Sequence, residues 1–163
     1  MELTNIDAQI SDMNAKLMWM LEKQVGLAVL ELVKTEPHVA DLLASGDVKV
    51  RYAALAVSSM NRAINEEIAT HCEKLARTDP EQSVRGLALT CLSSFYEKKN
   101  NARIGQLFAT VVHDENESPD VRWVAYNGLC SLREEAHCSI SATKPSSRFP
   151  EDADWAWVDS FFS

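Results

Sequence analysis

The feature that most constrains the fold of this chain is a repeat built on a Val-Arg pair. The arginines of the three copies, Arg51, Arg85 and Arg122, recur at a spacing of about 35 residues, which is typical of helical repeat proteins. Each arginine is preceded by valine and followed three positions later by alanine. Turn-forming and helix-capping residues stand before each pair, at 45–47, 78–80 and 117–120. Each Val-Arg pair is therefore expected near the start of a helix.

The segments between these pairs also have a helical pattern. Apolar residues recur at intervals of three and four over 64–76 and 102–112, and no strand-like alternation competes with this period. The composition agrees, since hydrophobic residues make up 46% of the chain and there are only 5 Gly and 5 Pro. The expected unit is a helix, a short loop and a second helix. One such unit cannot bury its own apolar face, so the units must stack on one another.

The best copy of the repeat has the pattern Asp-x-x-Val-Arg-x-x-Ala, in Asp47, Val50, Arg51 and Ala54. This pattern resembles the second helix of a HEAT repeat, and it is closest to the bacterial HEAT-like repeats first named from bilin lyases of the phycobilisome. The resemblance covers 37–135. It implies an all-α fold, a right-handed α-solenoid of about three helical hairpins whose second helices line a concave surface. It implies little about function, because this architecture serves many unrelated tasks.

We expect one domain over 1–163, because the chain suffices for a single sizeable core. Its expected parts are an N-terminal capping helix or helix pair, the repeats, a loop and a C-terminal helix, at 1–36, 37–135, 136–150 and 151–163. The C-terminal helix has one strongly apolar face. Two interpretations of it stay open: a cap over the last repeat, or a docking helix for a second copy or a partner. The side chains available for either role are Trp155, Trp157, Phe161 and Phe162.

The repeat arginines have two interpretations. Arg51, Arg85 and Arg122 could form a basic ladder that binds phosphates. In the HEAT-like repeats that the chain resembles, however, the residue at this position usually bridges to an acidic side chain of an adjacent repeat. Asp47, Asp79 and Asp120 lie in the matching turns and favour this structural role.

A stripe along the Val-Arg helices is the candidate binding surface. Positions that follow the arginine by one, five, eight and twelve residues share one helical face, which is less apolar than the core positions. Tyr and Trp on this stripe are the residue types that most often dominate binding hot spots. The alternative is that Tyr52 and Trp123 pack against adjoining helices. The candidate partner-binding residues are Tyr52, Thr90, Glu97, Trp123, Asn127 and Glu134.

Charge narrows the class of partner. The net charge is −8, and most of the acidic excess lies in 113–163. An acidic surface repels phosphate backbones, so nucleic acid is disfavoured, including for a solenoid that binds DNA lesions. A protein with a basic surface is favoured. The chain shows neither a secretory signal nor an apolar run of membrane-spanning length, and its four cysteines do not resemble a disulfide framework. We therefore expect a reduced, cytoplasmic protein without membrane contacts.

Catalytic and metal chemistry find little support. The pairs His71-Cys72 and His137-Cys138 could supply four zinc ligands, but adjacent ligands lack the usual spacing, so no metal is expected. No nucleophile with a base, phosphate-binding glycine loop or carboxylate pair is evident, so we expect neither an enzyme nor a cofactor. The leading hypothesis is a non-enzymatic module that binds a protein through its concave face. Two alternatives remain: an immunity protein that neutralises a basic toxin enzyme, and a bilin-lyase-like enzyme accessory. The oligomeric state is left open.

Overall fold

The fold is known from a computed structural model that describes residues 39–60, 64–133, 149–151 and 153–162. All regular secondary structure in these ranges is helical, so the prediction of an all-α fold is confirmed there. The N-terminal cap expected at 1–36, most of the loop expected at 136–150 and the candidate residue Glu134 lie outside the described residues.

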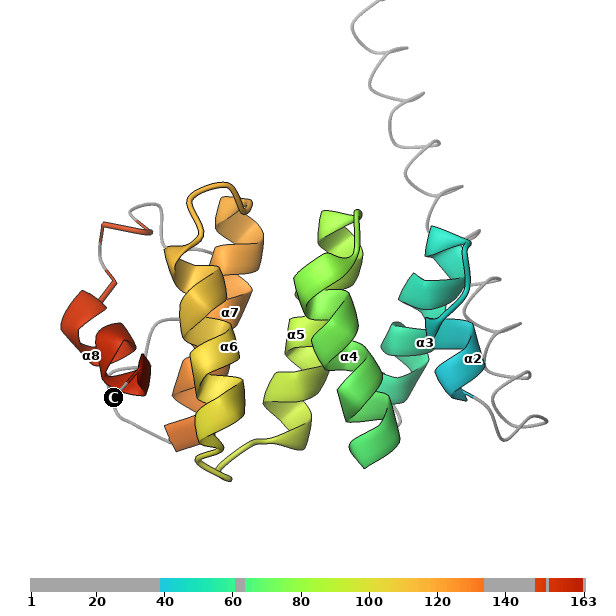
Figure 1. Ribbon diagram of the computed structural model, residues 1–163, viewed down its shortest axis with the longest axis horizontal. Coiled ribbons are helices and arrows are strands. Elements are labelled where there is room, and N and C mark those ends of the chain that lie inside the picture. The colour runs from blue at the N-terminus through green and yellow to red at the C-terminus, as the bar shows by residue number, and fades with distance from the viewer. Residues whose placement is uncertain (1–38, 61–63, 134–148, 152, 163) are drawn as a thin grey trace, which may run out of the picture.

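The helices are arranged as consecutive hairpins. Helix α2 (Val39–Leu43) pairs with α3 (Val48–Met60), α4 (Glu66–Thr78) with α5 (Gln82–Phe95), and α6 (Ala102–His113) with α7 (Pro119–Arg133). The second helices pack on one another in the order α3, α5, α7, and α2 also contacts α4. Figure 1 shows the hairpins side by side along the long axis, with α4 and α6 in front of α5 and α7.

Short polar side chains set where several helices begin. The side-chain oxygen of Asn65 accepts a hydrogen bond from the Ile68 amide at 2.9 Å, and Asn101 accepts one from the Ile104 amide at 3.1 Å. These bonds satisfy amides of the first turn that have no partner within the helix. Helices α4 and α6 therefore start where their sequences supply an acceptor, close to the expected positions 64 and 102.

The loop between α5 and α6 holds the end of α7. Lys98 and Asn100 have φ values of 60° and 42°, in the left-handed region that L residues seldom adopt. Their amides donate to the carbonyls of Ser131, at 2.9 Å, and Leu132, at 3.2 Å. Because the last carbonyls of a helix lack partners within it, these two bonds offset the cost of the unusual backbone and join two hairpins.

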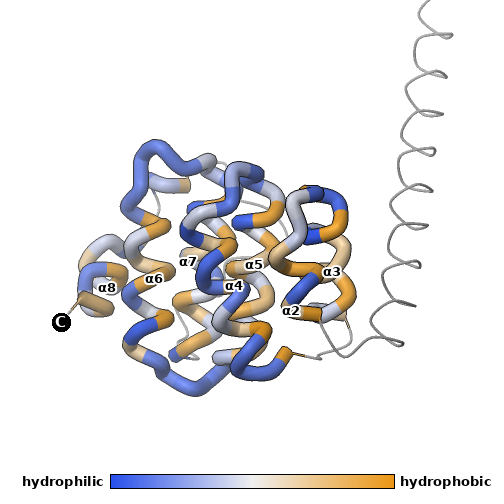
Figure 2. The backbone as a smooth tube through the Cα atoms, turned by 45° about the vertical axis from the view of Figure 1, so that its right-hand side comes forward, coloured by the Kyte–Doolittle hydropathy of each residue, from blue (hydrophilic) through white to orange (hydrophobic). Residues whose placement is uncertain are grey.

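The core lies between the two helical layers, and two glycines allow close approach within it. A Cβ on Gly128 of α7 would lie 2.7 Å from the ring of Phe108, a fully buried residue of α6. A Cβ on Gly105 of α6 would lie 2.5 Å from the ring of Phe161. Figure 2 shows that hydrophobic residues recur along the helices and that the loop between α6 and α7 is hydrophilic.

The C-terminal helix is shorter than the range 151–163 predicted from the sequence. Helix α8 (Trp155–Asp159) begins after Asp154, whose carboxylate accepts the Trp157 amide at 3.0 Å, and it continues as a 3-10 turn, η2 (Ser160–Phe162). The start expected at residue 151 is therefore too early, because Asp154 caps the helix and Trp155 is its first residue. The η2 turn packs against α6, where Phe161 occupies the space beside Gly105.

Candidate functional site

The first repeat arginine joins two hairpins. Arg51, at the start of α3, donates from Nε and Nη2 to the two carboxylate oxygens of Asp79, at 2.7 and 3.0 Å. Its Nη1 donates to the carbonyl of Ser45 at 2.8 Å, in the loop that precedes its own helix. Only 2% of the Asp79 side chain and 10% of the Arg51 side chain are exposed. Each of the three guanidinium nitrogens therefore has a partner inside the protein, and burial keeps the group from binding a phosphate in solvent.

The second repeat arginine makes the same kind of bridge one hairpin further along. Arg85 Nε and Nη2 donate to Glu117 at 2.5 and 2.7 Å, and Nη1 donates to the carbonyl of Asp79 at 2.8 Å. An acidic residue of an adjacent repeat was expected beside each repeat arginine, and both Arg51 and Arg85 have one. In the third turn the expected residue was Asp120, whereas Glu117 pairs with Arg85 and Asp120 is exposed. Glu117 precedes the helix, so its side chain reaches back toward α5, while Asp120 already lies in the first turn of α7.

The third repeat arginine differs from the other two. Arg122 Nε donates to the carbonyl of Val112 at 2.8 Å, and no carboxylate pairs with its guanidinium among the described residues. Arg122 lines a surface cavity of ≈ 460 Å³ that is largely open to solvent, together with His113, Glu115, Pro150 and Trp155. The cavity lies between the α6–α7 loop and the C-terminal segment, at the end of the row of arginines.

The bridges shift the pKa values of their members. Burial opposes ionisation of Asp79, but hydrogen bonds from Arg51 and from the Glu81 amide outweigh it, so the pKa of Asp79 lies below its ordinary value. The Arg85 hydrogen bonds likewise lower the pKa of Glu117 against the effect of burial. The same contacts raise the pKa values of Arg51 and Arg85. Both bridges are therefore ion pairs at neutral pH.

The candidate stripe is exposed on α3 and α5. Tyr52 on α3 is 42% exposed, and Thr90 and Glu97 on or just after α5 are exposed as well. Asn127 on α7 is half-buried, and its side-chain amide donates to the carbonyl of Trp123 at 3.1 Å. The stripe thus becomes less accessible from α3 to α7.

Trp123 is the exception to the predicted exposed stripe. Its side chain is only 4% exposed, and its ring packs edge-on against Phe149 at a centroid distance of 5.3 Å and stacks near Tyr126 at 6.1 Å. The buried indole Nε1 has no hydrogen-bond partner among the residues that the structure describes. Exposure and packing were the two interpretations of Trp123, and the structure shows that it packs against Phe149. The segment around Phe149 covers the ring, which a pattern internal to α7 could not reveal.

The C-terminal aromatic residues lie against the last hairpin. Phe161 is 6% exposed, lies under the guanidinium of Arg133 at 3.7 Å and meets the ring of Trp157 edge-on at 5.2 Å. Trp155 is half-buried and faces His113 of α6 at a centroid distance of 5.0 Å, whereas Phe162 is 49% exposed. This geometry is that of a helix docked on its own chain.

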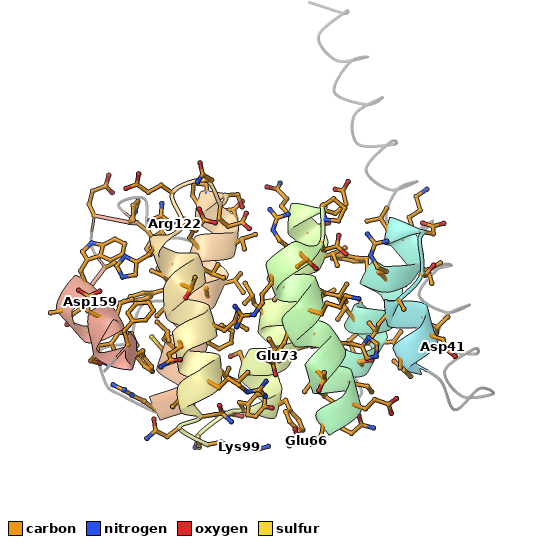
Figure 3. The ribbon with its side chains drawn as sticks, in the orientation of Figure 1. Asp41, Glu66, Glu73, Lys99, Arg122 and Asp159 are labelled. Carbon is orange, nitrogen blue, oxygen red and sulfur yellow. The ribbon has the colours of Figure 1, made fainter. Side chains whose placement is uncertain are left out.

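A contact between His113 and Asp159 fixes the same segment and was not anticipated from the sequence. The two side chains meet at 2.9 Å between His113 Nε2 and Asp159 Oδ1. Their 46-residue separation gives no local signal. Figure 3 labels Asp159 on α8 and Arg122 near the top of the α6–α7 hairpin.

The cysteines that the structure describes are all buried. Cys72 and Cys91 are fully buried free thiols on α4 and α5, and a hydrogen bond with Cys91 together with burial raises the pKa of Cys72. Such a thiol is a poor nucleophile and a poor metal ligand. Cys130 is buried on α7. Within the described ranges, no group of three or more His, Cys, Asp or Glu side chains is placed to hold a metal ion, and the half-buried His71 joins no such group.

Two findings bear on the class of protein. Within the described ranges, no helix is long and apolar enough to cross a membrane. Neither a protein-family model, nor a curated protein, nor a solved structure matches the chain.

Proposed function

We propose that the chain is a non-enzymatic protein-binding module built as a right-handed α-solenoid of HEAT-like hairpins. The packing order of the second helices supports the solenoid, because each of α3, α5 and α7 contacts its neighbour in the series. The two arginine bridges support it as well, since each joins one hairpin to the loop of the next. A protein stacked in this way offers continuous surfaces along the row of helices.

The observation that carries the proposal is the exposed apolar side of α3. Tyr52 is 42% and Met60 is 82% exposed, and they are two of the three large hydrophobic side chains exposed among the described residues. Ala56 and Ser59, both half-buried, share the helical face of Tyr52, and Met60 lies about 80° around the helix from Tyr52. An amphipathic tyrosine beside small residues is a favourable anchor for a protein partner. Thr90 continues the surface onto α5.

Charge supports a basic partner. Asp114, Glu115 and Asp120 are exposed in and just after the α6–α7 loop, and none of them has an ion-pair partner within the described ranges. Such a loop accelerates association with a basic surface and disfavours acidic competitors. An immunity protein that covers the active site of a basic toxin enzyme is the narrower form of this proposal. A bilin-lyase-like accessory role rests on the sequence resemblance alone.

The test is affinity capture from the native host with matched surface variants, followed by mass spectrometry. Tyr52→Ser and Met60→Ser should each reduce recovery of the partner several-fold while leaving the circular dichroism spectrum unchanged. Gln106→Ser, which alters an exposed residue of α6 in the other layer, is the control and should recover the partner normally. Equal recovery by all variants would refute binding through α3. For the immunity form, the recovered partner must be an enzyme that the purified chain inhibits.

A further inference from the structure

The arginine row has an open position at its C-terminal end. Arg51 and Arg85 each place Nε and Nη2 on a carboxylate supplied by the loop of the following hairpin. Arg122 occupies the matching position in the third copy, but no following hairpin supplies a carboxylate to it among the described residues. Its Nε turns instead to the carbonyl of Val112 in its own hairpin.

The surroundings of Arg122 form a cavity with two kinds of wall. Trp155 and Pro150 supply apolar surface, and the ring of His113 lies beside Trp155. Glu115 supplies a carboxylate on the same cavity. Neither Nη atom of Arg122 has a hydrogen-bond partner among the residues the structure describes. A guanidinium in this state presents two parallel N–H donors that match a carboxylate.

The charge around the cavity restricts what carries that carboxylate. Glu115 lines the cavity, and Asp114 and Asp120 are exposed on the same loop and helix start. A small, freely diffusing anion is repelled by this local excess of negative charge. A partner protein can avoid this repulsion if basic side chains flank its carboxylate. The carboxylate then pairs with Arg122, and the basic side chains pair with the acidic loop.

We propose that this cavity is the docking site for an acidic side chain of a protein partner, held by Arg122 and flanked on the partner by Lys or Arg that contact the α6–α7 loop. The acidic side chain accepts from the two Nη groups of Arg122, whereas Asp79 and Glu117 accept from Nε and Nη2 in the two earlier bridges. The inference rests on the proposed protein-binding function and adds a second contact, distant from Tyr52.

The test uses the full chain and two synthetic peptides, acetyl-Lys-Lys-Glu-Lys-Lys-amide and the same peptide with Gln at the centre. Binding is followed by NMR through the indole signal of Trp155, assigned with Trp155→Phe. The Glu peptide should bind about fivefold more tightly than the Gln peptide, the ratio that one partly exposed ion pair supports. Arg122→Gln should abolish this preference. Arg77→Gln, an exposed arginine of α4 away from the cavity, should retain it.

Two results would overturn the proposal. Equal affinity of the two peptides for the unaltered chain would mean that basic residues alone are attracted to the loop. Shifts at Trp155 caused by sodium acetate or inorganic phosphate at the concentrations used for the Glu peptide would mean that the cavity takes small anions. Circular dichroism of Arg122→Gln separates loss of fold from loss of binding. Affinity capture with the Tyr52→Ser variant tests the α3 surface separately, so failure of the α3 contact can be distinguished from failure of the Arg122 contact.

Discussion

Replacing Asp79 by asparagine should destabilise the protein more than the corresponding change in any other ion pair described here. The carboxylate accepts from Nε and Nη2 of Arg51 and from the Glu81 amide. An asparagine keeps one of the two oxygens and turns an amide NH₂ toward a donor. The guanidinium of Arg51, whose side chain is 10% exposed, then loses its paired carboxylate and keeps only the weaker Coulombic attraction of Asp47 and Glu81 among the described residues.

The magnitude follows from burial. Breaking a buried ion pair by removing one member costs about 3–5 kcal/mol, because the remaining charge stays out of water. Asp79 is 2% exposed and lies near that limit, and we take about 3 kcal/mol because the Nη1 bond to Ser45 remains. Glu117→Gln removes the equivalent charge where 9% of the glutamate and 20% of Arg85 are exposed. Partial hydration of that pair reduces the expected cost to about 1.5 kcal/mol.

Urea unfolding at pH 7 measures both changes, with Arg51→Met and Arg85→Met completing two double-mutant cycles. The coupling energy should be larger in the Arg51 cycle than in the Arg85 cycle. A matched control is Glu73→Gln, whose partner Arg103 is 62% exposed, and its cost should be below that of Asp79→Asn. The reasoning from burial fails if Glu117→Gln costs as much as Asp79→Asn, or if Asp79→Asn costs less than about 1 kcal/mol.

Three further predictions concern pH, packing and the aromatic residues. Because the pKa values of Asp79 and Glu117 are lowered in the folded state, the stability they contribute is fully present above about pH 5 and is lost as the pH falls below about 4; Asp79→Asn should flatten this dependence in urea titrations across that range. Gly105→Ala should displace Phe161, which a Cβ would approach to 2.5 Å, at a cost of about 1–3 kcal/mol, and proteolysis should then cut the C-terminal segment first. Trp123→Ala should lower the free energy of unfolding by about 3–5 kcal/mol, and a loss below about 1 kcal/mol would contradict its burial.

The repeat could be located from the sequence because its signals are local. Helical spacing of apolar residues and the turns before each Val-Arg pair predicted the helices α3 to α7 to within a few residues. The bridge from Arg51 to Asp79 was also within reach, since both lie at repeated positions. The partner of Arg85 was not, because the choice between Glu117 and Asp120 depends on which direction a side chain leaves the turn.

The exposure of the aromatic residues could not be predicted from the repeat pattern. Tyr52 and Trp123 occupy the same position after the repeat arginine, yet Tyr52 is 42% and Trp123 only 4% exposed. The difference arises from Phe149, which packs on Trp123 from a segment that belongs to no repeat. The spacing of residues in the sequence assigns a residue to a helical face. Whether another part of the chain covers that face depends on residues outside the repeat.

The end of the stack explains why the third copy differs from the first two. A hairpin in the middle of the series has a following hairpin that supplies both apolar surface and a carboxylate for the repeat arginine. Beside the last hairpin that the structure describes, Phe161 next to Gly105 and the aromatic contacts of Trp157 supply the apolar surface. The docked segment supplies no carboxylate to Arg122 among the described residues. The last hairpin is thus covered by apolar side chains but receives no carboxylate for its arginine from the described residues. Arg122 lines the cavity in which we place the acidic side chain of a partner.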